Sequence, residues 1–168
     1  MGLVQVATNT VTSAVSSVSL TGIDSDDVYM LAVHSYIPSS DNKDMRLRVL
    51  ESGTANSTSN YDMSAKVLRT DTSFGDDEHT NATDLDTSTG IGNATGEMAN
   101  WIIYIYNAFN SSEFTFFTIE NTMLSSDPIL IGRQGGGVFT SNSQVNGVEL
   151  RANSGNIASG TFTLYKVV

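Results

Sequence analysis

Short alternations of apolar and polar residues recur along the chain and predict β-strands. In the run Met45–Val49, apolar side chains alternate with Arg46 and Arg48, so one face of the strand is expected to be buried and the other wet. No stretch has the sustained i, i+3, i+4, i+7 apolar spacing of an amphipathic helix. Strand patterns cover these segments: Leu3–Ala7, Val18–Ile23, Val28–Ile37, Met45–Glu51, Met63–Leu68, Trp101–Ala108, Glu113–Glu120, Ile129–Gly132, Val138–Thr140, Gln144–Ala152 and Gly160–Val168.

Turn-forming residues separate these segments. The stretches 38–42, 107–112, 125–128 and 153–156 are rich in Asn, Ser, Asp, Pro and Gly, which supply turn chemistry. Many short strands between such turns are typical of a sandwich or a barrel. The sequence therefore predicts an all-β fold, an antiparallel and jelly-roll-like β-sandwich that forms a single domain over residues 1–168.

One segment, residues 71–96, breaks this rhythm. It has few apolar residues, six Asp or Glu residues and no Lys or Arg. Loops longer than about 12–15 residues are usually functional or disordered. We expect one long acidic loop within the domain, and a solvated loop is the favoured interpretation. A contact arm that becomes ordered on a neighbouring subunit and a cation site are the alternatives.

Clusters of carboxylates are the candidates for a metal site, because carboxylate oxygens suit Ca²⁺. The spacing of an EF-hand loop is absent, so an exposed Asx turn is the favoured interpretation of the cluster at residues 24–27. No other cofactor is predicted. The candidate Ca²⁺ ligands are Asp24, Asp26, Asp27, Asp76, Asp77 and Glu78.

No catalytic residue can be assigned from spacing. His34 and His79 lie 45 positions apart without an HExxH motif, and no G-x-S-x-G motif activates any of the serines. Catalysis by paired carboxylates requires one acid with a raised pKa in a pocket, and no pair stands out here. We therefore expect a protein without enzymatic activity.

The run Trp101–Tyr106 is apolar on both faces of its predicted strand. This pattern indicates either a central strand covered on both sides or a strand whose outer face meets another subunit. The three glycines after Gln134 favour a wide turn or a close approach by another chain. A sugar-stacking platform is an alternative role for the aromatic run, although burial is the better default. The run consists of Trp101, Tyr104, Tyr106, Phe109, Phe114, Phe116 and Phe117. The interface candidates are Trp101, Tyr104, Tyr106, Phe109, Gly135, Gly136 and Gly137.

The composition narrows the classes of partner. The chain has 18 acidic against 8 basic residues, a formal net charge of −10, and this acidity disfavours nucleic acid and anionic membrane surfaces as partners. The 22 Ser, 19 Thr and 14 Asn residues give it a surface of hydroxyls and amides. It has no cysteine, and its first residues lack the features of a signal peptide.

Motifs at both ends and in part of the middle carry a family resemblance. The segment LTGIDSDDVYMLAVHSYIPSSDNKDMRLRVLESGTANSTSNYD and the terminal SGTFTLY resemble small β-rich proteins of tailed bacteriophages, many of them marine. Lys166 stands where that group usually has glycine, and the acidic segment is particular to this chain. The matching positions are Gly22-Ile23, Tyr29, Pro38, Arg48, Tyr61-Asp62 and Ser159–Tyr165.

The resemblance implies a virion structural protein with a sandwich fold and no family catalytic residue. The first hypothesis is a capsid decoration or cement protein on the head surface, assembled in the host cytoplasm. Its partners would be the major capsid protein or tail proteins, and the protein would be a homo-oligomer. The alternative is a tail or fibre module that binds glycan or another host surface through loops 51–60 and 132–137. These loops lack aromatic residues, which counts against a glycan site there. A polysaccharide-cleaving enzyme is the third hypothesis and would need a carboxylate pair in a cleft.

Overall fold

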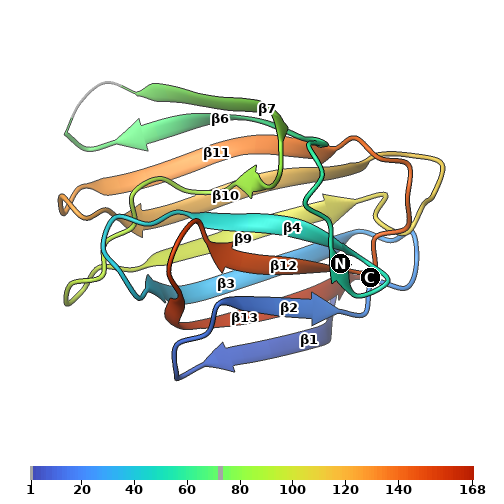
Figure 1. Cartoon of the computed structure of the whole chain (residues 1–168), viewed down its shortest axis with the longest axis horizontal. Helices are drawn as coiled ribbons and strands as arrows, with labels where there is room; N and C mark the ends of the chain where they lie inside the picture. The colour runs from blue at the N-terminus through green and yellow to red at the C-terminus, as the bar shows by residue number, and fades with distance from the viewer. Residues whose placement is uncertain (1, 72–73) are drawn as a thin grey trace.

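The computed structural model describes residues 2–71 and 74–168 (Figure 1). The fold is all-β, with no helix in the described part, and two antiparallel sheets pack against each other as a sandwich, as the sequence predicted. The strands are β1 (Leu3–Val11), β2 (Ser17–Thr21), β3 (Tyr29–Pro38), β4 (Met45–Glu51), β5 (Thr54–Ala55), β6 (Tyr61–Arg69), β7 (Gly75–Ala82), β8 (Leu85–Asp86), β9 (Ala99–Tyr106), β10 (Thr115–Leu124), β11 (Leu130–Phe139), β12 (Gly147–Ala152) and β13 (Ile157–Val167).

The two sheets differ in size. The larger sheet has eight strands in the order β1-β13-β3-β9-β10-β11-β6-β7. The smaller sheet has five, in the order β2-β12-β4-β5, with β8 also paired to β4. In Figure 1 the smaller sheet lies in front of part of the larger one, and β6 and β7 lie beyond it. One side of the sandwich therefore needs a covering that the smaller sheet does not provide.

Alternate residues of each strand fill the space between the sheets. On β9, Trp101, Ile103 and Ile105 are buried, whereas Ile102 between them is 45% exposed. Tyr36 meets the ring of Trp101 edge-on, with ring centroids 5.5 Å apart. Such pairs add about 0.5–1.5 kcal/mol beyond the burial of area. The strand that is apolar on both faces therefore has one face in the core and one face outside.

The last strand lies inside the larger sheet. β13 pairs with β1 on one side and with β3 on the other, so both of its edges are hydrogen-bonded. Phe162 and Leu164 are fully buried between the sheets. The regular alternation at the end of the sequence thus belongs to a strand that completes the core.

The acidic segment 71–96 contains two strands that the sequence pattern did not predict. β7 pairs with β6 at the edge of the larger sheet, and β8 pairs with β4 in the smaller sheet. The chain thereby crosses from one sheet to the other on the side where the smaller sheet stops. No apolar alternation marks β7, because its inward residues include Asp77 and His79, which face charged partners.

The glycine run Gly135–Gly137 lies in the middle of β11, where we had expected a wide turn or a close approach by another chain. The strand continues through it, and the close approach comes from the same chain. A Cβ on Gly135 would lie 2.3 Å from the Ser64 carbonyl oxygen, and one on Gly137 would lie 2.7 Å from Leu85 Cδ2. Glycine here admits neighbouring chain segments that a side chain would push away.

Candidate functional site

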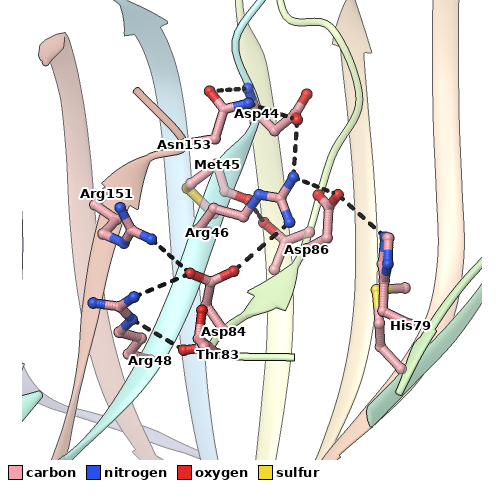
Figure 2. Close-up of polar contacts among 12 residues, drawn as sticks. Asp44, Met45, Arg46, Arg48, His79, Thr83, Asp84, Asp86, Arg151 and Asn153 are labelled. Carbon is pink, nitrogen blue, oxygen red and sulfur yellow. Dashed lines mark hydrogen bonds and ion pairs between the residues drawn. The ribbon is translucent and has the colours of Figure 1, made fainter. Parts of the chain in front are cut away.

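Four of the five arginines of the chain lie beside the acidic residues of β7, of β8 and of the turn between them. Figure 2 shows three of these arginines, Arg46, Arg48 and Arg151. The contributing strands come from both sheets, so the contacts cross the side of the sandwich. Ion pairs within proteins stabilise only when their geometry and hydrogen bonding offset the loss of hydration. We call these residues the arginine–aspartate cluster: Arg46, Arg48, Arg133, Arg151, Asp44, Asp77, Asp84, Asp86 and His79.

Arg133 is the most deeply buried charge of the cluster, with 1% of its side chain exposed. It projects from the inner face of β11, where the alternation of the strand would otherwise place an apolar residue. Its Nη1 donates to the Ser88 carbonyl at 2.8 Å and to Asp86 Oδ1 at 3.4 Å. Its Nη2 pairs with Asp77 Oδ2. A buried guanidinium is tolerated here because carboxylates and a carbonyl replace its water.

Asp84 forms ion pairs with three arginines of the smaller sheet. In Figure 2 Arg48 and Arg151 lie on one side of it, and their Nη2 atoms donate to its Oδ2 at 3.4 and 2.6 Å. Arg46 and Arg151 stand directly opposite each other on β4 and β12, and like charges in that position destabilise a sheet. Asp84, which is 3.7 Å from Arg46 Nη1, offsets this repulsion.

Asp86 connects the two halves of the cluster. Arg46 Nη2 lies 2.9 Å from its Oδ2, and Arg133 reaches its other oxygen. Burial raises the pKa of the Asp86 carboxyl, while the nearby Arg46 and Arg133 guanidinium groups oppose that rise. The ionised carboxylate is therefore held by its arginine partners against a cost of burial.

A metal-binding role for part of the cluster has one geometric argument in its favour. Asp77, His79 and Asp86 bring three potential ligand atoms within 4.8 Å of one another. Arg133, however, already pairs with both carboxylates, and its positive charge would repel a cation placed between them. His79 Nε2 is 3.3 Å from Asp77 Oδ1 and 3.6 Å from Asp86 Oδ2. The arrangement is an ion-pair network, with Arg133 in the place of a cation.

The other candidate Ca²⁺ ligands of the acidic segment do not join Asp77. β7 alternates, so Asp76 and Glu78 lie on the outer face of the sheet, opposite to Asp77. Asp76 pairs there with Lys66. The sequence placed these three acids side by side, and the strand separates them.

The acids at residues 24–27 form a hydrogen-bonded turn. Tyr29 donates its hydroxyl proton to Asp24 at 3.0 Å, and Ser25 donates to Asp27 at 2.7 Å. Lys166 from β13 lies 2.6 Å from Asp27 and lowers the pKa of that carboxyl. The Asp26 carboxylate accepts a hydrogen bond from the Asn110 amide. Each of the three carboxylates thus has a donor from the protein itself.

The interface candidates divide between the core and the surface. Trp101 is in the core, where its indole nitrogen donates to the Thr87 carbonyl at 2.9 Å. Phe109 packs against the core from a turn. Tyr104 and Tyr106 lie on the outer face of β9 and are half-buried. Of the glycines, Gly136 faces outward, whereas Gly135 and Gly137 face the interior.

The outer face of the larger sheet is the second notable feature. Among the outward positions of β13, β3, β9, β10 and β11, all of them described, Glu120 alone is charged at neutral pH. The apolar residues there include Ile102 and Phe116, which is 47% exposed. Charged residues return on the flanking strands, where Lys66 and Asp76 lie. We call this surface the open face: Met30, Ala32, Ile102, Tyr104, Tyr106, Phe116, Thr118, Val138 and Tyr165.

The open face is not flat. A groove of about 430 Å³ lies where β3, β9 and β10 run side by side. A second hollow, of about 330 Å³, lies over Gly136, which has no side chain to fill it. The groove is lined by the side chains of Ala32, His34, Asn100, Ile102, Glu120 and Thr122, among others.

A third hollow lies at the end of the open face, beside Phe116. It measures about 310 Å³ and is lined by Asn107, Ser112, Glu113, Phe114, Phe116 and Asn142. Phe114 is 40% exposed, so this hollow combines exposed rings with amide, hydroxyl and carboxylate groups. The sequence marks both rings as part of an aromatic run, but no spacing rule brings Asn142, from the segment after β11, beside them.

Comparisons with known proteins do not identify the chain: no family model, curated protein or solved structure matches it. In the described part of the chain, no helix has the length and apolar character needed to cross a membrane.

Proposed function

We propose that this chain is a non-enzymatic structural protein of a bacteriophage virion, a capsid decoration or cement protein on the head surface. The observation that carries the proposal is the open face, where Ile102 and Phe116 are exposed on a nearly uncharged surface, because exposed apolar patches mark sites of protein contact. The resemblance of Gly22-Ile23, Arg48 and Ser159–Tyr165 to small phage proteins supplies the virion context. The partners would be the major capsid protein and further copies of this chain.

The arginine–aspartate cluster supports a structural role. Its carboxylates are paired with arginines, and the most buried of them, Asp84 and Asp86, are 7% and 6% exposed. A general acid or base must reach the proton that it transfers in a substrate pose. Charges that hold the two sheets together leave little freedom for that task.

Immunogold electron microscopy tests the virion role. Antibody raised against the recombinant chain would be applied to purified particles of the phage that carries its gene, with antibody pre-absorbed on the protein as control. We expect gold over the whole head surface. Label confined to the tail would contradict the decoration role, and particles without label would contradict the virion role altogether.

A tail or fibre module that binds glycan is the second candidate, favoured by the hollow beside Phe114 and Phe116. Exposed rings beside amides can stack on a sugar ring and hydrogen-bond its hydroxyls. NMR titration with host-surface oligosaccharides would test it, since shifts at Asn107, Asn142 and the two rings are expected. A spectrum without shifts at millimolar sugar would remove this candidate.

A further inference from the structure

The open face is large enough to bind another protein molecule. Five neighbouring strands spaced about 4.8 Å apart, each about seven residues long at 3.3 Å per residue, make a plan area of about 550 Å². Side-chain relief raises the accessible area above this value, toward the roughly 800 Å² per partner of a standard interface. Its anatomy also fits, with an apolar centre, charged residues such as Lys66, Asp76 and Glu78 on the flank formed by β6 and β7, and uncharged polar residues on β1 at the other flank.

The distribution of charge on the chain indicates which kind of partner can bind the open face. The chain carries a net charge of −10, so two copies repel each other over most of their surfaces. The central strands of the open face contribute one of the 18 acidic residues, Glu120. A strongly basic partner would find little to attract it there. The partner that matches this face is one whose own contact surface is apolar and nearly uncharged, and a second open face, with Glu120 as its one charge, has that property.

The shape of the open face is complementary to itself. Phe116 protrudes from β10 at one end, and the groove beside Glu120 and Thr122 lies toward the other end of the same strand. Five residues of strand separate Phe116 from the centre of the groove, about 16 Å. A two-fold axis running across the strands between them would place each Phe116 over the groove of the other copy. A contact of this kind is isologous and closes at two subunits.

We propose that a second copy of this chain covers the open face, forming a two-fold dimer in which Phe116 of each copy enters the groove beside Ile102 of the other. The inference rests on the proposed function only in treating the open face as a protein-contact surface. Thr118, which is exposed and lies between Phe116 and Glu120, is then close to the axis. Residues away from the face, such as the exposed Val4 on β1, take no part.

The oligomeric state of the full chain tests the proposal, measured by sedimentation equilibrium from about 1 μM to 1 mM. The variants are Ile102→Asp, Thr118→Arg and the matched control Val4→Asp, which adds the same charge at an apolar position that is 52% exposed. Thr118→Arg replaces one exposed polar residue with another, so folding is preserved even if Ile102→Asp disturbs it. Thermal unfolding of each variant checks this directly.

We expect wild type and Val4→Asp to sediment at twice the mass of one chain. Ile102→Asp and Thr118→Arg should weaken the dimer at least thirtyfold, about the effect of losing a hot-spot residue. A monomeric wild type, a dimer unaffected by both face variants, equal weakening by Val4→Asp, or growth beyond two subunits would each overturn the proposal. None of these results depends on virion labelling, so the dimer and the virion role can fail separately.

Discussion

The inner and outer faces of the larger sheet differ in where their charged side chains lie. On its inner face, toward the edge formed by β11, β6 and β7, Arg133 and Asp77 are drawn into the interior and paired. On its outer face, the central strands have almost no charge and leave Ile102 and Phe116 exposed. Burial favours apolar side chains, so a simple sandwich would have the reverse distribution.

The difference indicates separate tasks for the two regions. The arginine–aspartate cluster connects β11 and β7 of the larger sheet to β4, β8 and β12, and so closes a side that the smaller sheet leaves uncovered. The open face contributes little to the fold of one chain and is available for contact. Stability should therefore be sensitive to substitutions in the cluster, and association to substitutions on the open face.

Arg133→Met gives the largest expected effect. The substitution leaves Asp77 and Asp86 without their buried partner, and breaking a buried pair in this way costs about 3–5 kcal/mol of unfolding free energy. Urea unfolding measures the loss. The control is Arg69→Met, which removes an arginine paired with Asp71 on the surface, where little or no loss of stability is expected because water screens the pair.

A triple variant separates the uncompensated charges from the lost packing. Adding Asp77→Asn and Asp86→Asn to Arg133→Met removes the two carboxylates that lost Arg133 as a partner, of which Asp86 still pairs with Arg46. We expect at least about half of the lost stability to return, because the penalty belongs largely to isolated buried charge. If the triple variant recovers no stability, Arg133 stabilises this side of the sandwich mainly by packing. The cluster and the open face would then differ in how their side chains pack rather than in how they place charge.

Asp86→Asn tests the cluster through the pH dependence of stability. Its effect is expected to be smaller than that of Arg133→Met. The pKa of Asp86 is raised in the folded chain, so the folded state binds its proton more readily than the unfolded state. As pH rises from about 3 to about 7, wild type loses stability through this group and the variant does not. The unfolding free energy of wild type minus that of Asp86→Asn should therefore fall across this range. A difference that rises would contradict the raised pKa, and Asp76→Asn controls for loss of an exposed carboxylate.

Much of the fold could be read from the sequence because most strands follow simple alternation. Met45, Leu47 and Val49 of β4 are buried and the arginines between them are partly exposed, as their spacing predicts. The sequence pattern does not predict β7, because its inward residues Asp77 and His79 are polar. Their charged partners come from other strands and are known only from the tertiary structure. For β11 the sequence predicts two short strands, because Gly135–Gly137 favour a turn between them. In the structure these glycines leave room for the β6 backbone and for Leu85.

The candidate sites were harder to predict than the strands. Asp76, Asp77 and Glu78 looked like one cluster, but the alternation of a strand that was not foreseen separates them. Arg133, Asp84 and Asp86 are far apart in sequence, and no spacing rule links them. The pattern of Trp101–Tyr106 left open which face was covered, since both are apolar. That choice depends on where the smaller sheet packs.

The smallest expected effect is that of Ile102→Ala, for which the neighbouring residue Ile103 of β9 is the matched control. Ile103 is fully buried and Ile102 is 45% exposed on the open face. Ile103→Ala should cost about 2–5 kcal/mol of unfolding free energy, because it opens a cavity in the core. Ile102→Ala should change it by about 0.5 kcal/mol or less when the chain is dilute enough to be monomeric. Denaturant unfolding in the nanomolar range, followed by the fluorescence of Trp101, measures both. A large loss of unfolding free energy in Ile102→Ala under these conditions would mean that the open face stabilises the single chain. The open face and the arginine–aspartate cluster would then not have separate roles.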